Sequence, residues 1–164
     1  GQEGLVVMIP RRGAMVANIT EEDLNDVLEV RLGLEIMAIE KACKRMDQEQ
    51  LEKLKKAGEE FRETMKTGDL TLLAEADVNF HEIIYQASGN KRLIQMLNNL
   101  REQIYRYRIE YLKDEQTRNQ LADEHDEMYQ AICRKDMKEA CRMTSIHIEN
   151  QRRAIIRTIH GEEE

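Results

Sequence analysis

Residues 76–90, ADVNFHEIIYQASGN, place two ionisable side chains within the apolar stripe of a predicted helix. Asp77 and His81 are four residues apart, so on an α-helix they point the same way, one turn from each other. The apolar residues of this stripe recur at helical spacing as Leu70, Leu73, Phe80, Ile84 and Ala87. An unpaired carboxylate or imidazole on a buried face is costly. The sequence therefore predicts a helical interior that holds a polar cluster, in which the partners are either other side chains or a metal ion.

The composition favours helices throughout the chain. Hydrophobic residues make up 41% and charged residues 35% of the 164 residues, with one proline and no tryptophan, which is typical of helical proteins. No segment approaches the roughly 18 apolar residues that cross a bilayer, and no signal-peptide pattern is present. We therefore expect a cytoplasmic protein without membrane contact. The net charge of −7 argues against nucleic-acid binding by this chain alone.

Amphipathic segments follow one another from residue 20 onward. Capping residues and short polar connections place them at about 20–46, 47–67, 69–88, 91–112, 115–134 and 136–160. Such segments with short connections pack as antiparallel neighbours. The sequence predicts an all-α domain over residues 20–164, an antiparallel bundle of about six helices.

Residues 1–19 have a different character. A β-like run at 5–9 is followed by the turn-forming sequence PRRG and a second short run at 14–17, which together predict a small hairpin. A lone hairpin is marginal in water and normally belongs to a larger unit; the alternative is a frayed tail. The first residue is not methionine, so we expect the chain to begin partway through a longer protein.

Two further histidines face inward on other predicted helices. His125 and His147 both lie at helical spacing from apolar neighbours. A bundle interior is where facing helices assemble metal sites, although a single inward histidine is more often a hydrogen-bonded core residue. Together with Asp77 and His81 they would form an N₃O donor set suited to Zn²⁺, Ni²⁺, Mn²⁺ or Fe²⁺. Periodicity leaves both interpretations open, because it does not show that the three helices meet at one height.

Four separated blocks of the sequence resemble one known domain. They are LNDVLEVRLGLE (24–35), ADVNFHEIIYQASGN (76–90), EHDEMYQAICRKDMKEA (124–140) and SIHIENQ (145–151). In this order they resemble the effector-binding domain of GntR-type transcription regulators of the FadR subfamily, called the FCD domain. The segment PRRGAMVA (10–17) is similar to the end of the wing in the preceding winged helix-turn-helix. The resemblance covers essentially the whole chain, and it implies that residues 1–19 are a remnant of the wing and linker.

The resemblance also implies a function and a metal site. Domains of this kind sense a small metabolite, form homodimers and govern a DNA-binding head, so this chain would contact DNA only through an N-terminal domain. In members with this motif set an Asp and three His hold a divalent metal, which maps onto Asp77, His81, His125 and His147. A fatty-acid-responsive branch lacks these ligands. The chain therefore resembles the metal-containing branch, with Zn²⁺ as the first expectation.

Three arginines are candidates for binding a carboxylate effector. Four protein ligands leave one or two positions on a five- or six-coordinate metal, where a sugar acid, a hydroxy acid or a dicarboxylate could bind beside an arginine. Arg31 lies in the stripe of the first helix and in a block that resembles the family. Arg101 and Arg108 share the predicted inward face of the fourth helix. For each arginine the alternative is an ion pair with a neighbouring acid.

An enzyme and a purely structural protein are the competing interpretations. Inward histidines and the adjacent pair His125-Asp126 could belong to a metal-dependent helical phosphohydrolase of the HD kind. Adjacent residues on a helix point about 100° apart, however, so Asp126 should leave the metal face if His125 lies on it. The third interpretation is a metal-free helical dimeriser. The resemblance favours a non-enzymatic regulator.

Overall fold

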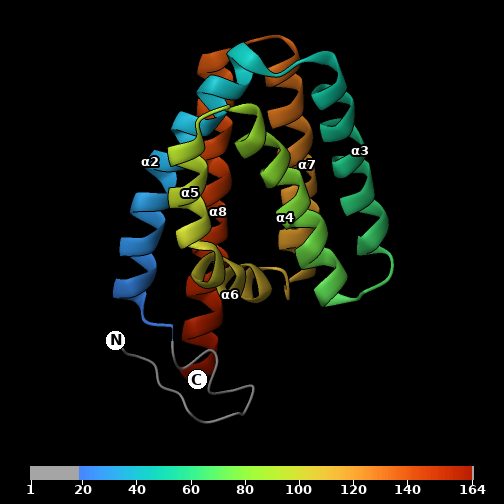
Figure 1. The fold of residues 1–164 in the computed structure, drawn as a ribbon. Coiled ribbons are helices and arrows are strands. Elements are labelled where there is room, and N and C mark those ends of the chain that lie inside the picture. The colour runs from blue at the N-terminus through green and yellow to red at the C-terminus, as the bar shows by residue number, and fades with distance from the viewer. Residues whose placement is uncertain (1–18, 164) are drawn as a thin grey trace.

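Helices account for nearly all of the described chain, which in this computed structural model comprises residues 19–163 (Figure 1). The helices of this range are α2 (Glu21–Arg45), α3 (Gln48–Met65), α4 (Leu70–Ala87), α5 (Lys91–Asn99), α6 (Arg101–Tyr111), α7 (Glu115–Cys133) and α8 (Met137–Glu163). The predicted all-α bundle is confirmed. The predicted hairpin falls on residues 1–18, outside the described range.

Polar capping side chains begin the helices where the sequence indicates. The Thr20 hydroxyl accepts a hydrogen bond from the backbone N–H of Asp23 at 3.1 Å. Asp47 and Gln50 form a capping box, in which each side chain accepts from the other residue's backbone N–H, at 2.8 and 3.0 Å. After α3, Gly68 has a φ of 71°, in the left-handed region that glycine adopts without steric penalty. These local signals explain why most predicted boundaries agree with the structure to within a few residues.

The segment predicted as one helix over residues 91–112 forms two helices instead. The chain leaves the helical conformation at Leu100 (φ −95°, ψ 2°), whose N–H bonds the carbonyl of Leu97 at 3.1 Å in a tightened turn. Asn98 and Asn99 precede the break, and their amides compete for backbone hydrogen bonds. In Figure 1, α6 crosses the lower end of the bundle in a different direction from α5. This change of direction packs α6 against α4 and α8.

A buried polar layer separates two apolar clusters in the middle of the bundle. Asp77 and His81 lie in this layer on α4, His125 lies in it on α7, and His147 lies in it on α8. The apolar residues that flank the layer on either side are Leu73 and Ile84 on α4, Leu121 and Met128 on α7, and Ala154 and Met143 on α8. The order of the clusters along the chain shows that α8 runs antiparallel to α4 and α7. The three helices therefore meet at one height, which periodicity alone could not establish.

The outer helices complete the bundle around this layer. Helix α2 packs along α8, and α3 covers α4 and α7 from the other side (Figure 1). Within the described residues, no helix combines the length and the apolar character that a membrane crossing requires.

Adjacent leucines on α4 provide a test of this packing. Leu73 is fully buried, whereas Leu72 is 43% exposed. We expect Leu73→Ala to lower the free energy of unfolding by about 2–5 kcal/mol, because it leaves a cavity in the core. Leu72→Ala should change it by less than about 0.5 kcal/mol. Urea denaturation followed by circular dichroism measures both, and equal losses at the two positions would contradict the described packing.

Candidate metal centre

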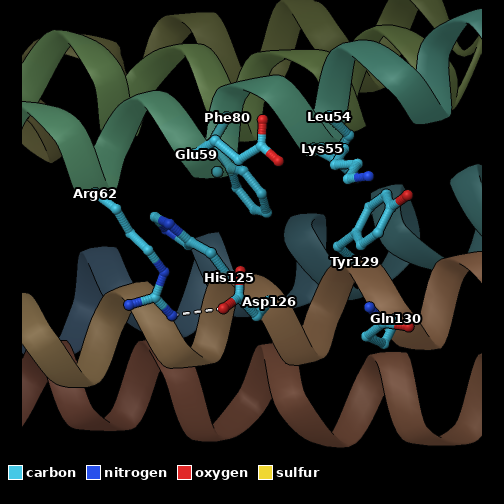
Figure 2. Close-up of a pocket in the computed structure, with 10 residues that line it drawn as sticks. Leu54, Lys55, Glu59, Arg62, Phe80, His125, Asp126, Tyr129 and Gln130 are labelled. Carbon is cyan, nitrogen blue, oxygen red and sulfur yellow. Dashed lines mark hydrogen bonds and ion pairs between the residues drawn. The ribbon is translucent and has the colours of Figure 1, made fainter.

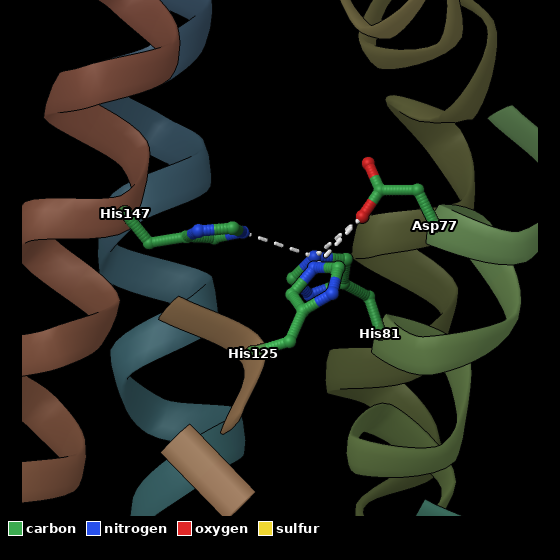
Figure 3. Close-up of side chains that lie close together, drawn as sticks. All are labelled: Asp77, His81, His125 and His147. Carbon is green, nitrogen blue, oxygen red and sulfur yellow. Dashed lines mark hydrogen bonds and ion pairs between the residues drawn. The ribbon is translucent and has the colours of Figure 1, made fainter. Parts of the chain in front are cut away.

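The four predicted metal ligands meet in the buried polar layer (Figure 3). Asp77, His81, His125 and His147 each offer one ligand atom, and these atoms all lie within 4.8 Å of one another. Helix α4 supplies Asp77 and His81 from consecutive turns, and Figure 3 shows His147 entering from the opposite side. None of the four side chains is more than 1% exposed. The fold thus brings together residues that are up to 70 positions apart in the sequence.

Asp77 is shared between the imidazoles and two donors from α6. Its Oδ1 lies 3.3 Å from His81 Nε2 and 3.1 Å from His125 Nε2. Its Oδ2 accepts hydrogen bonds from Arg108 Nε at 2.8 Å and from the Tyr111 hydroxyl at 2.6 Å. Because α6 crosses the bundle here, its Arg108 and Tyr111 side chains bind one oxygen of the Asp77 carboxylate, and the other oxygen faces the histidines.

Several buried polar atoms of the layer have no hydrogen-bond partner. Among them are Asp77 Oδ1 and His125 Nε2, which lie close to each other without hydrogen-bond geometry. Nearly all buried polar atoms in proteins are paired. An oxygen and ring nitrogens that converge without satisfying one another are the donor atoms that a divalent cation would use. The residues present therefore fit a metal ion.

The electrostatics of the layer set the protonation states that metal ligands need. Burial would raise the pKa of Asp77, but the Arg108 cation and the neighbouring imidazoles hold that pKa well below its usual value. Burial lowers the pKa of His81 to about 4, against the opposing effect of Asp77. Burial likewise lowers the pKa of His125. An anionic carboxylate and neutral imidazoles at neutral pH are the forms that bind metal.

His147 is oriented by residues that the sequence reasoning missed. Its Nδ1 donates to Glu124 Oε1 at 2.7 Å, and Glu124 Oε2 accepts from the Asn150 amide. Its Nε2 faces His81 Nε2 at 3.2 Å. A carboxylate that accepts from the outer nitrogen of a ligating histidine fixes the ring and its tautomer. Glu124 adjoins His125 in the sequence, so the two side chains should point to different faces of α7. Glu124 reaches His147 because α7 packs against α8.

Two of the three predicted effector-binding arginines reach the polar layer. Arg31 is fully buried; its Nε donates to Glu35 at 3.0 Å and its Nη1 donates to Gln151 at 2.7 Å, while Nη2 has no partner. Arg108 is 4% exposed and is paired with Asp77. Glu35 and Gln151 were missed as well, although each lies four residues after a singled-out residue on the same helix face.

Arg101 does not share the inward face, and this prediction is wrong. Its side chain is exposed on the first turn of α6. The prediction continued the stripe of Leu97 through residue 100, but the break at Leu100 ends that stripe. The structure therefore separates Arg101 from the polar layer.

A pocket of about 300 Å³ opens between α3 and α7 and reaches the layer at His125 (Figure 2). The His125 ring stacks on Phe80, with ring centroids 4.1 Å apart, and both residues line the pocket. Arg62 reaches from α3 to Asp126 of α7 beside the pocket. As expected for the residue after His125, Asp126 points away from the candidate ligands. The His125-Asp126 pair thus does not act as a joint metal-binding unit.

Comparison with known sequences identifies one domain family. The sequence model of the FCD domain matches residues 26–150. The "Gluconate operon transcriptional repressor" of Bacillus subtilis is 31% identical over 150 residues, which cover 87% of this chain and 60% of that protein. The "Uncharacterized HTH-type transcriptional regulator YdhC" of the same organism is 24% identical over 140 residues, covering 85% of this chain and 62% of that protein. The chain thus spans about three fifths of the length of these relatives.

Solved structures share the fold. Streptococcus agalactiae GntR superposes with a TM-score of 0.66 at 25% identity, over 84% of this chain and 62% of that one. E. coli McbR/YncC superposes with a TM-score of 0.79 over 85% of this chain and 71% of that one. At 15% identity, the latter match concerns the fold alone.

Buried neutral histidines should make the stability of the metal-free protein depend on pH. In the unfolded chain His81 titrates near pH 6.5, whereas its folded pKa is about 4. The unfolded state binds more protons between these values, so stability falls as the pH falls from about 6.5 to about 4. The contribution of His81 reaches about 3 kcal/mol at the lower limit.

Urea unfolding at several pH values, with a chelator present, measures this dependence. His81→Leu should show a flatter decline, and His160→Ala, which alters an exposed residue near the end of α8, should behave like the parent. Identical profiles for His81→Leu and the parent would contradict the prediction.

Proposed function

Because the chain belongs to the FCD domain family, and is thus a ligand-sensing effector domain of the GntR type, we propose that it senses a small carboxylate through a bound divalent metal. The observation that carries the proposal is the buried Asp-His-His-His cluster, whose ligand atoms lie within 4.8 Å of one another. Membership of the FadR subfamily and of its metal-containing branch is part of the same proposal. The domain would govern DNA binding by a winged-helix domain and would act as a homodimer.

Asp77, His81, His125 and His147 would hold the metal. Three imidazole nitrogens and one carboxylate oxygen suit Zn²⁺ first, with Ni²⁺, Mn²⁺ and Fe²⁺ as alternatives. The ion would supply a fixed positive charge to which an anionic oxygen of the effector can bind. Asp77, already held by Arg108 and Tyr111, would keep its free oxygen toward that ion.

The charge balance around the layer supports an anionic effector. Arg31 and Arg108 bring two positive charges, while Asp77, Glu35 and Glu124 bring three negative ones, so these buried groups carry a net charge of −1. A divalent cation changes this to +1. An uncompensated charge in the interior is costly, and a carboxylate beside the metal would neutralise it.

Arg31 is the best-supported residue for contacting the effector. Its Nη2 is buried without a partner, so this nitrogen can donate a charge-assisted hydrogen bond to a carboxylate. Arg108 also lies in the layer, where its Nε donates to the proposed ligand Asp77. Arg101 has no such support because it is exposed.

Sugar acids, hydroxy acids and dicarboxylates are the proposed effector classes. The relative named for the gluconate operon makes gluconate a reasonable first member of the screen. The name describes that protein, and its resemblance to this chain supports the sugar-acid class without singling out one compound.

Zinc should stabilise the protein through the four proposed ligands. At free Zn²⁺ of 100 times Kd, a metal that binds only the folded state adds about 2.7 kcal/mol, so Tm should rise with zinc concentration. Asp77→Ala and His147→Ala should lose this shift, and His160→Ala should keep it. Thermal unfolding and metal analysis of the purified protein provide the measurements. A zinc shift that survives both ligand substitutions would contradict the site.

An effector should raise Tm further, and only when metal is present. A thermal-shift screen of gluconate and the other carboxylate classes, with and without chelator, tests this. For a compound found in this way, Arg31→Lys should weaken binding about tenfold or more, because it removes charge-assisted hydrogen bonds. Arg101→Lys is the matched control and should leave binding unchanged.

The same compound should change the DNA affinity of the intact regulator, and His147→Ala should blunt this change. An unaltered response in that variant would contradict metal-dependent sensing.

A further inference from the structure

Gln151 joins a proposed metal ligand to the proposed effector arginine. It is fully buried on α8, one turn after His147. Its Oε1 accepts from Arg31 Nη1 at 2.7 Å, and its Nε2 lies 3.0 Å from His147 Nε2. A guanidinium can only donate hydrogen bonds. The contact with Arg31 therefore identifies the oxygen end of the amide, and the NH₂ end must face the histidine.

The tautomer of His147 is determined from the other side of the ring. Glu124 Oε1 lies 2.7 Å from Nδ1, and a carboxylate accepts, so Nδ1 carries the proton and Nε2 carries the lone pair. The Gln151 amide therefore donates to Nε2. The same nitrogen faces His81 Nε2 at 3.2 Å, on the side where the candidate ligand atoms converge. A neutral imidazole has a single lone pair at this position, which a hydrogen bond and a metal cannot both use.

We propose that Gln151 is a displaceable cap on the metal-facing nitrogen of His147. In the metal-free protein its amide occupies the lone pair, and it must release that lone pair when a metal binds. Glu124 has the opposite effect, because its hydrogen bond holds the lone pair of His147 toward the site. Since Arg31 holds the other end of the Gln151 amide, metal loading alters the hydrogen bonding of this arginine. The inference rests on the metal site of the proposed function.

Substitutions of the two residues should change zinc affinity in opposite directions. Gln151→Leu removes the competing donor and should tighten Zn²⁺ binding about three- to tenfold. Glu124→Ala should weaken it about 10- to 100-fold; Glu124→Gln should weaken it less, because its amide oxygen can still accept from Nδ1. Competition with a chelator of known affinity measures all of them. Damage to the fold alone would weaken binding in every variant.

Thr144→Val is the matched control on the same helix. The Thr144 hydroxyl is buried and donates to the Ala140 carbonyl at 2.8 Å, and among the described residues it makes no hydrogen bond to a candidate ligand. This variant should bind zinc like the parent. If Gln151→Leu binds zinc no more tightly than Thr144→Val, the inference is overturned while the metal site stands. If the parent itself binds no zinc, the proposed function fails and the inference fails with it.

A crystal structure of the zinc-loaded parent gives a second test that needs no variant. We expect zinc on Nε2 of His147 and the Gln151 amide out of hydrogen-bond contact with that nitrogen. Zinc bound to Nδ1, or a Gln151 amide that still donates to Nε2, would overturn the inference.

Discussion

The interior of this bundle depends on the ion pair between Asp77 and Arg108. A carboxylate withdrawn from water is tolerated only when other groups replace its hydration. Arg108 and Tyr111 do so for one oxygen, which keeps the group ionised while the second oxygen faces the histidines. Both donors come from α6, so the break after α5 is a requirement of the site. The apolar clusters on either side help to bury the layer, and electrostatic interactions within it are correspondingly strong.

The polar layer links helices that are otherwise held together by apolar packing. Helices α4, α7 and α8 contribute the candidate ligands, and α2 contributes Arg31. In the proposed function, an ion and a carboxylate at this level would touch four helices at once. Their binding would favour the arrangement of helices that best fits both, and a sensor domain requires a difference of this kind between its states.

Much of the fold and part of the site could be predicted from local patterns. Helical periodicity placed Asp77, His81, His125, His147 and Arg31 on buried faces, and capping residues located most helix ends. Periodicity did not predict the helix break at Leu100. The two preceding asparagines only weaken a helix, and the direction of α6 is decided by its tertiary contacts. Arg101 was misplaced for that reason. Glu124 could not be predicted, since its role arises from the packing of α7 on α8, whereas the four-residue spacing of Glu35 and Gln151 was a usable signal.

The pocket between α3 and α7 bears on how fast the candidate metal centre could exchange its ion. The stacked rings of Phe80 and His125 line this pocket, and His125 is itself one of the candidate ligands. Rearrangement of side chains and of one covering helix takes far less time than global unfolding, which for small domains can require hours or days. An ion held in this layer would therefore be shielded from solvent and would still exchange without global unfolding. Its occupancy would then follow the supply of metal within the lifetime of the folded protein.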